Sequence, residues 1–174
     1  IVDTDMRKSV LVGRLRAKVE SGGKIYGLSH YLSGQVSLDK VVYATNIKGV
    51  FILFAGHEVP NPTELLETKE FKELIEFGEK NFDNVLVDTP PTGAAIDAAV
   101  VGKNVDGAVI VAAQNVTSSR AIINTKRTLE DSGVKILGAV LNKCRFEESK
   151  YGHYYGNYYG NYYGNYYGRD DDEK

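Results

Sequence analysis

The segment VLVDTPP, residues 85–91, constrains the fold more than any other part of the chain. Three consecutive apolar residues run into a carboxylate, Asp88, and then into two prolines. A short continuous apolar run of this kind is typical of a strand that is covered on both faces, as in a parallel sheet with helices on each side. The segment therefore predicts an α/β fold in which Asp88 lies at the carboxyl end of a buried strand.

Two later segments have the same apolar character and are separated by a helix pattern. Residues 107–113 and 135–141 each predict a strand. Between them, Thr117 or Ser118 is placed to cap a helix, and Gly133 is placed to end it. The order strand, helix, strand predicts a right-handed crossover between parallel strands.

The part of the chain before Asp88 also alternates between strands and helices. Residues 40–44 and 50–54 predict strands, and Ile1-Val2 resembles the inside of a strand, so that we expect the sequence to be a fragment. Asn61, as a cap followed by Pro62, predicts a single helix that continues to about Gly78. Together these elements predict a three-layer α/β/α sandwich with a mostly parallel sheet.

The composition changes abruptly after Lys150. The tetrapeptide YYGN occurs three times in direct succession over residues 154–165, so we expect one domain over residues 1–150 and a disordered tyrosine-rich tail over residues 151–174. The tail holds two of the 21 basic and four of the 23 acidic residues, which leaves a neutral domain with 19 of each. A neutral domain argues against nucleic-acid binding. We find neither a zinc-ligand spacing nor an apolar run of roughly 20 residues that would span a membrane.

Three aspartates are expected at the carboxyl ends of strands, where open α/β sheets bind ligands. They are Asp3, Asp5 and Asp88. Such a group can hold a hydrated magnesium ion, and one of its members can accept a proton from a hydroxyl group. An aspartate after a strand more often caps a helix or is simply solvated, and an Asp-x-Asp pair also binds metal in glycosyltransferases.

Two motifs together are more specific than any single aspartate. IVDTDMR, residues 1–7, resembles the Walker A′ motif, and NVLVDTPP, residues 84–91, resembles the Walker B motif of bacterial tyrosine kinases of capsule and exopolysaccharide synthesis. These kinases form part of the MinD/ParA-like branch of P-loop ATPases. The similarity continues through residues 27–34, 61–66 and 141–143 and so covers nearly all of the domain.

The resemblance implies ATP and Mg²⁺ as cofactors and a role for each motif residue. Asp3 is then the candidate base for the attacking tyrosine, Asp5 and Asp88 hold magnesium mostly through water, and Asn142 faces the adenine. Arg7 belongs to the motif, either at the cofactor or in a salt bridge to a neighbouring subunit. The implied phosphoacceptors are the tail tyrosines: Tyr151, Tyr154, Tyr155, Tyr158, Tyr159, Tyr162, Tyr163, Tyr166 and Tyr167.

The chain departs from the family in one respect. The pattern G-x-x-x-x-G-K-[ST], whose amides and lysine cradle phosphates, does not occur in this sequence. We expect that loop upstream of Ile1, with the first strand and helix. We also expect this chain by itself to bind ATP poorly and to be inactive.

The predicted function is an ATP-dependent protein tyrosine kinase that phosphorylates its own tail in trans and so regulates capsule or exopolysaccharide synthesis and export. Its expected partners are copies of itself in a ring, a transmembrane adaptor or polysaccharide co-polymerase that holds it at the cytoplasmic face of the membrane, and a cognate tyrosine phosphatase. Two alternatives remain: a MinD/ParA-like ATPase, and a non-enzymatic scaffold that displays phosphotyrosine. For the tail, the alternative is an aromatic linker.

Overall fold

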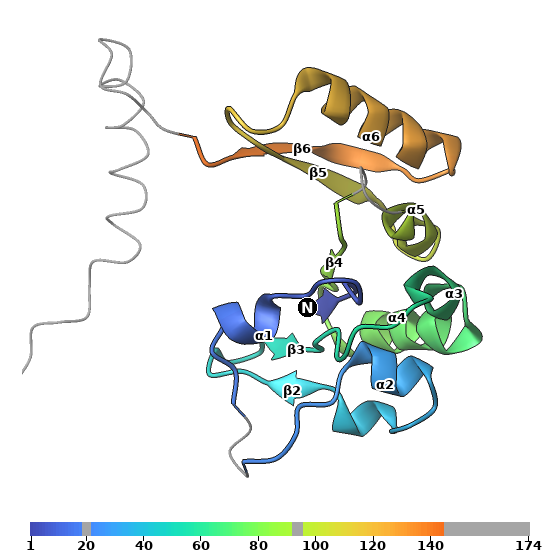
Figure 1. Ribbon diagram of the computed structural model, residues 1–174. Coiled ribbons are helices and arrows are strands. Elements are labelled where there is room, and N and C mark those ends of the chain that lie inside the picture. The colour runs from blue at the N-terminus through green and yellow to red at the C-terminus, as the bar shows by residue number, and fades with distance from the viewer. Residues whose placement is uncertain (19–21, 92–95, 145–174) are drawn as a thin grey trace, which may run out of the picture.

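The computed structural model describes residues 1–18, 22–91 and 96–144, and these form an α/β fold (Figure 1). Helices and short strands alternate along the chain, as the sequence predicts. The helices are α1 (Leu11–Arg14), α2 (Leu28–Leu32), α3 (Pro62–Leu66), α4 (Lys69–Asn81), α5 (Asp97–Gly102) and α6 (Ser119–Asp131), with a 3₁₀ turn at Leu38–Lys40. The strands are β1 (Val2–Asp3), β2 (Tyr43–Ala44), β3 (Phe51–Ile52), β4 (Val87–Asp88), β5 (Ala108–Ala113) and β6 (Ile136–Asn142).

The strands pair in three groups, two of which are parallel. β1 pairs with β4 and β5 pairs with β6, both in parallel, whereas β2 and β3 form an antiparallel pair. A parallel bridge between Val2 and Leu53 joins β1 to the residues after β3. β1 is therefore flanked on both sides, with β4 along one edge and the continuation of β3 along the other.

The unit β5–α6–β6 agrees closely with the sequence prediction. The Ser118 hydroxyl accepts a hydrogen bond from the Ala121 amide at 3.2 Å and so caps α6. Gly133 follows the helix with a φ of 79°, a conformation that glycine adopts without steric cost. Both strands of the unit lie within one residue of their predicted bounds.

The predicted single helix from Pro62 to Gly78 is wrong, because the structure contains two helices there. α3 ends at Leu66, and Thr68 begins α4 by accepting a hydrogen bond from the Phe71 amide at 3.4 Å. Asn61 does not cap α3 through its side chain, which donates to Glu64 Oε2 at 2.8 Å instead. The break at Thr68 turns α4 so that its apolar side chains enter the core.

The main core lies between the β1–β4 pair and the helices α2, α3 and α4. Phe71, Leu66 and Leu28 are all fully buried. Burial of a side chain of this size stabilises the fold by about 1.5–3 kcal/mol relative to exposure. A second, smaller cluster joins α5 and α6 to β5 through Ala98, Leu129 and Ile110.

The expectation that the apolar strands are covered on both faces holds only in part. Ile110 packs against α5 and α6, but Val109 and Val111, on the other face of β5, are 51% and 64% exposed. Leu86, just before β4, is 66% exposed. Over the described residues, helices cover only one face of β5, so that the other face presents valine side chains to solvent.

The tail over residues 151–174, with its nine predicted acceptor tyrosines, lies outside the described residues. The same is true of the boundary predicted at residue 150. Among the helices at residues 1–18, 22–91 and 96–144, none has the length and apolar character needed to cross a membrane.

Candidate active site

Two of the predicted aspartates stand side by side because their strands are paired in register. Asp3 and Asp88 are direct partners in the parallel pair β1–β4, where neighbouring strands lie about 4.8 Å apart. Thr4 strengthens this junction, since its amide and its hydroxyl both donate to the Asp88 carbonyl oxygen, at 2.9 and 2.7 Å. The two predicted motifs therefore meet at the carboxyl ends of adjacent strands.

The Asp3 carboxylate is almost fully buried and is held at both oxygens. Asp3 as a whole is 1% exposed. Oδ1 accepts a hydrogen bond from the Asp5 amide at 3.0 Å, and Oδ2 accepts one from the Ser9 hydroxyl. These bonds fix the orientation of Asp3, and Ser9 is a contact that the sequence did not predict.

The Asp5 carboxylate organises the loop after β1. Its Oδ1 accepts hydrogen bonds from the amides of Arg7 and Lys8, at 3.2 and 3.0 Å. An aspartate that accepts amide bonds two and three residues further on forms a local turn. The turn holds Asp5, which is half-buried, close to Asp3 and Asp88 at the end of the strand pair.

The three carboxylates interact electrostatically. Burial raises the pKa of Asp88 above its usual range, and the charges of Asp3 and Asp5 raise it further. A cation between these side chains would relieve the repulsion, so the donor set fits magnesium. Over the described residues, no group of three or more His, Cys, Asp or Glu side chains is placed to hold a metal ion by itself. Magnesium does not need such a group, because it takes one or two carboxylates and keeps several waters.

Arg7 has a partner within the chain that the sequence did not reveal. Its Nε and Nη2 atoms donate to Asp97 Oδ2 and Oδ1, at 2.9 and 3.1 Å. Thr63 closes the group, because its hydroxyl donates to Asp97 Oδ1 at 2.6 Å and accepts from Arg7 Nη2 at 3.2 Å. Asp97 is fully buried. Neither of the predicted contacts of Arg7, with the cofactor or with a neighbouring subunit, is tested by this geometry.

The two members of this ion pair favour their charged forms. The hydrogen bond to Asp97 raises the pKa of Arg7. Burial alone would raise the pKa of Asp97, but the hydrogen bonds from Arg7 and Thr63 outweigh it, so that the pKa lies below its usual value. The buried carboxylate is therefore ionised and paired at neutral pH.

Asn142 lies at the end of β6, in a different strand pair from the carboxylates. The Asn142 carbonyl oxygen accepts from the Gln114 amide at 2.9 Å, and its side-chain Oδ1 accepts from the Lys143 amide at 2.7 Å. The residue is exposed. Its predicted contact with adenine stays a prediction.

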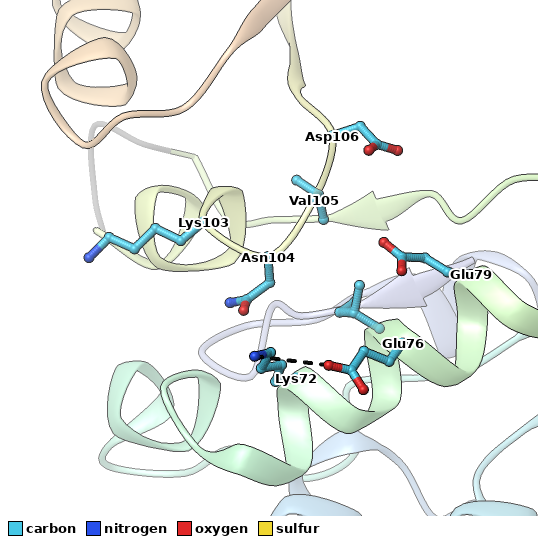
Figure 2. Close-up of a pocket in the computed structure, with 8 residues that line it drawn as sticks. Lys72, Glu76, Glu79, Lys103, Asn104, Val105 and Asp106 are labelled. Atoms are coloured by element: carbon cyan, nitrogen blue, oxygen red, sulfur yellow. Dashed lines mark ion pairs between the residues drawn. The ribbon is translucent and has the colours of Figure 1, made fainter.

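A shallow hollow lies away from the carboxylates, between α4 and the loop that leads into β5 (Figure 2). Lys72 and Glu76 form an ion pair across one turn of α4 at 3.9 Å on its rim. Its lining mixes both signs of charge on exposed side chains, and no converging polar group points to a ligand. The lining residues are Lys72, Ile75, Glu76, Glu79, Lys103, Asn104, Val105 and Asp106.

Known proteins resemble this chain in both sequence and fold. The sequence is 39% identical over 152 residues to the tyrosine-protein kinase CpsD of Streptococcus pneumoniae serotype 4, covering 87% of this chain and 65% of that relative. The chain thus spans slightly less than two thirds of that relative's length. The solved kinase domain of VpsO matches with a TM-score of 0.74 and 30% identity, over 83% of this chain and 69% of that one. This chain belongs to the bacterial tyrosine kinase family.

Other comparisons agree with the kinase family. The kinase domain of the Escherichia coli tyrosine kinase ETK matches with a TM-score of 0.78 and 33% identity, over 85% of this chain and 56% of that one. MinD of Pyrococcus horikoshii, solved with Mg-ADP, matches at 22% identity and a TM-score of 0.65, which shows a shared fold alone. No family model matches the sequence. The family resemblance and the α/β fold class predicted from the sequence are therefore confirmed.

Proposed function

We propose that the complete protein is an ATP-dependent protein tyrosine kinase that phosphorylates its own tail. The observation that supports this most directly is the gathering of Asp3, Asp5 and Asp88 at the ends of two paired strands. Relatives named as tyrosine-protein kinases share most of this chain. The expectation that this chain is inactive by itself stays a prediction.

Each aspartate has a separate task in this proposal. Asp5 and Asp88 hold magnesium, mostly through water, and Asp3 accepts the proton of the tyrosine hydroxyl. When bound, magnesium neutralises charge on the phosphate oxygens. The tyrosine oxygen then forms a bond to the γ-phosphorus of ATP while the bond from that phosphorus to the bridging oxygen breaks and ADP leaves. The Ser9 hydroxyl and the Asp5 amide keep the Asp3 carboxylate in one orientation during this step.

The tail is the proposed acceptor, and transfer takes place between subunits. A flexible chain of 24 residues has a root-mean-square span of roughly 25–30 Å, comparable to the diameter of a small domain. Each phosphate adds about −1.5 to −2 charges, so nine modified tyrosines would add on the order of −14 to −18. Tails that lie side by side in a ring of subunits would then repel one another, which gives phosphorylation a route to disassembly.

The wider role is proposed from the family. The protein would act at the cytoplasmic face of the membrane through a transmembrane adaptor or polysaccharide co-polymerase, and a cognate tyrosine phosphatase would reverse the modification. The cycle would regulate capsule or exopolysaccharide synthesis and export. A MinD-like ATPase is the second candidate, favoured by the shared fold alone.

A mixing experiment tests the proposed function. A complete protein that carries Asp3→Asn and the tail is mixed with an active partner that ends at Lys150, together with ATP and magnesium. We expect phosphate on the tail of the Asp3→Asn protein, because its own base has been removed and the truncated partner has no tail of its own. Mass spectrometry locates the phosphotyrosines.

The control uses Asp131→Asn, a change of the same kind on an exposed aspartate at the end of α6. The Asp131→Asn protein should phosphorylate its tail without the truncated active protein, whereas the Asp3→Asn protein by itself should not. A tail without phosphate in the mixture would exclude transfer in trans. Phosphate confined to Tyr26, Tyr31 or Tyr43 would leave the tail as a linker.

A further inference from the structure

The ion pair between Arg7 and Asp97 joins two segments that are far apart in the sequence. Arg7 lies two residues after Asp5 in the loop that follows β1. Asp97 is the first residue of α5 and lies nine residues after Asp88 in the sequence. The pair therefore connects the loop that carries one proposed magnesium ligand to the helix that follows the other.

The geometry of this connection is more restrictive than that of a single contact. Two nitrogens of Arg7 bind the two oxygens of Asp97, which fixes the plane of the guanidinium group. The Thr63 hydroxyl, from α3, binds both partners and so sets the position of the group against a third element. No ordinary surface pair has this form, because the Asp97 side chain is 0% exposed whereas the Arg7 side chain is 41% exposed.

The Arg7 backbone transmits this restraint to the carboxylate site. The amide of Arg7 donates to Asp5 Oδ1, so the residue whose side chain is fixed by Asp97 also binds a proposed magnesium ligand. On the opposite side of the same loop, the Met6 carbonyl oxygen accepts from the Val59 amide at 3.3 Å. The loop is thus anchored at residues 6 and 7, immediately after Asp5.

The three carboxylates carry like charges, which favours separation of the segments that hold them. The parallel pairing of β1 with β4 holds Asp3 beside Asp88, and the turn after β1 holds Asp5. A further restraint on that turn would act before a cation arrives. The Arg7–Asp97 pair is placed to provide it without a charge of its own, because the two ions neutralise each other.

We infer that Asp97 and Thr63 are positioning residues which act through Arg7 to hold Asp5 in register with Asp88 for magnesium. This inference rests on the proposed function, in which Asp5 and Asp88 are the magnesium ligands. In this inference Asp97 does not contact the metal or the substrate. It fixes the position of the loop that carries Asp5. Substitution of residues that orient metal ligands typically lowers metal affinity about 10–100-fold. Because Asp97 acts through the backbone of Arg7, we expect the lower end of that range.

The test uses the complete protein and three substitutions. Asp97→Asn keeps the shape of the side chain and removes its charge, Thr63→Val keeps the volume and removes the hydroxyl, and Thr63→Ser keeps the hydroxyl. The matched control is Glu73→Gln, which breaks the exposed pair between Lys69 and Glu73, at 2.8 Å on α4. Two quantities are measured: the magnesium concentration that gives half-maximal autophosphorylation, and Mn²⁺ affinity by electron paramagnetic resonance in the presence of ADP.

We expect Asp97→Asn to raise the magnesium midpoint and to weaken Mn²⁺ binding by about 10-fold. Thr63→Val should shift both in the same direction by a smaller factor, with Thr63→Ser close to the wild type and Glu73→Gln unchanged. A role in folding alone would lower the melting temperature but leave both quantities unchanged, and that result would overturn the inference. Since Asp97 is buried, Thr63→Val gives the answer if Asp97→Asn does not fold. A wild-type protein without magnesium-dependent autophosphorylation would instead overturn the proposed function.

Discussion

Replacing Gly27 by alanine should destabilise the protein, because the backbone at Gly27 lies against the backbone of residues 54–56. Gly27 precedes α2 with φ and ψ of −147° and −168°, angles that any residue adopts, so the cost is entirely steric. A Cβ atom there would lie 2.4 Å from the Phe54 carbonyl oxygen and 2.4 Å from the Gly56 amide nitrogen. Carbon atoms pack best at about 3.5–4.0 Å, so the backbones must separate by roughly 1 Å.

That separation has a cost that can be estimated from the contacts it would break. The Leu28 amide donates to Phe54 and the Ser29 amide to Ala55, at 2.7 and 2.9 Å, and both bonds lie at the affected junction. Overpacking costs about 1–3 kcal/mol, and each weakened hydrogen bond adds about 0.5–1.5 kcal/mol. We expect a loss of about 3 kcal/mol, which is a fall in melting temperature of roughly 6–12 °C.

Thermal unfolding followed by circular dichroism measures the melting temperature of Gly27→Ala, with Gly13→Ala as the matched control. Gly13 lies in α1, and a Cβ there meets no atom within 4 Å. Alanine in a helix is favoured over glycine by about 0.5–1 kcal/mol, so the control should melt at or slightly above the wild-type temperature. If both variants melt together, the close approach of Gly27 to the Phe54–Gly56 backbone does not limit stability.

Two further changes test the electrostatics and the exposed face. Burial and the charges of Asp3 and Asp5 raise the pKa of Asp88 above its value in the unfolded chain. The contribution of Asp88 to the free energy of unfolding is therefore favourable below the unfolded pKa, near about pH 4, and is lost as the pH rises through the folded pKa. Asp88→Asn should therefore raise the melting temperature at pH 7 by an amount worth at most about 1 kcal/mol, given the exposure of Asp88, and should not do so near pH 3. The same substitution should also abolish autophosphorylation of the complete protein. If Asp88→Asn and the wild type melt at the same temperature at both pH values, the carboxylates do not repel one another. For the exposed face, Val109→Thr with Val111→Thr should lower the fluorescence of the apolar dye ANS bound to this 174-residue chain without loss of helicity. Ile110→Thr, on the buried face, should instead unfold the chain at a lower temperature, and unchanged dye fluorescence in the double variant would place the apolar surface elsewhere.

The sequence predicted those elements whose signals are local. The cap at Thr117 or Ser118, the glycine at 133 and the apolar runs on either side of α6 all lie within residues 107–142, and the structure places the cap at Ser118. The junction of Asp3 with Asp88 was also predictable, because carboxyl ends of parallel strands meet at one edge. Thr68 shows where pattern reasoning fails: the helical pattern continues past it, but its hydroxyl accepts a hydrogen bond from the Phe71 amide and begins a second helix, in which Phe71 is fully buried.

The contacts of the candidate site were less predictable than its aspartates. Arg7 and Asp97 are 90 residues apart, and neither belongs to a periodic pattern that would reveal the other. Ser9 resembles any serine of a loop until its hydroxyl is seen to donate to Asp3. Motif residues can thus be read from one sequence, whereas the residues that orient them depend on which distant segments pack together.

The pairing of Arg7 also determines the electrostatic character of the site. Three carboxylates lie near the ends of β1 and β4 and interact electrostatically, and the guanidinium that follows them in the chain is already neutralised by Asp97. The site therefore attracts cations and, without one, repels the phosphates of a nucleotide. Magnesium reverses that sign locally, because a divalent ion between the carboxylates presents positive charge to the phosphate oxygens. On the proposed function, dependence on magnesium would follow from the charges of the site, because the pairing of Arg7 with Asp97 leaves the three carboxylates without a free guanidinium group beside them.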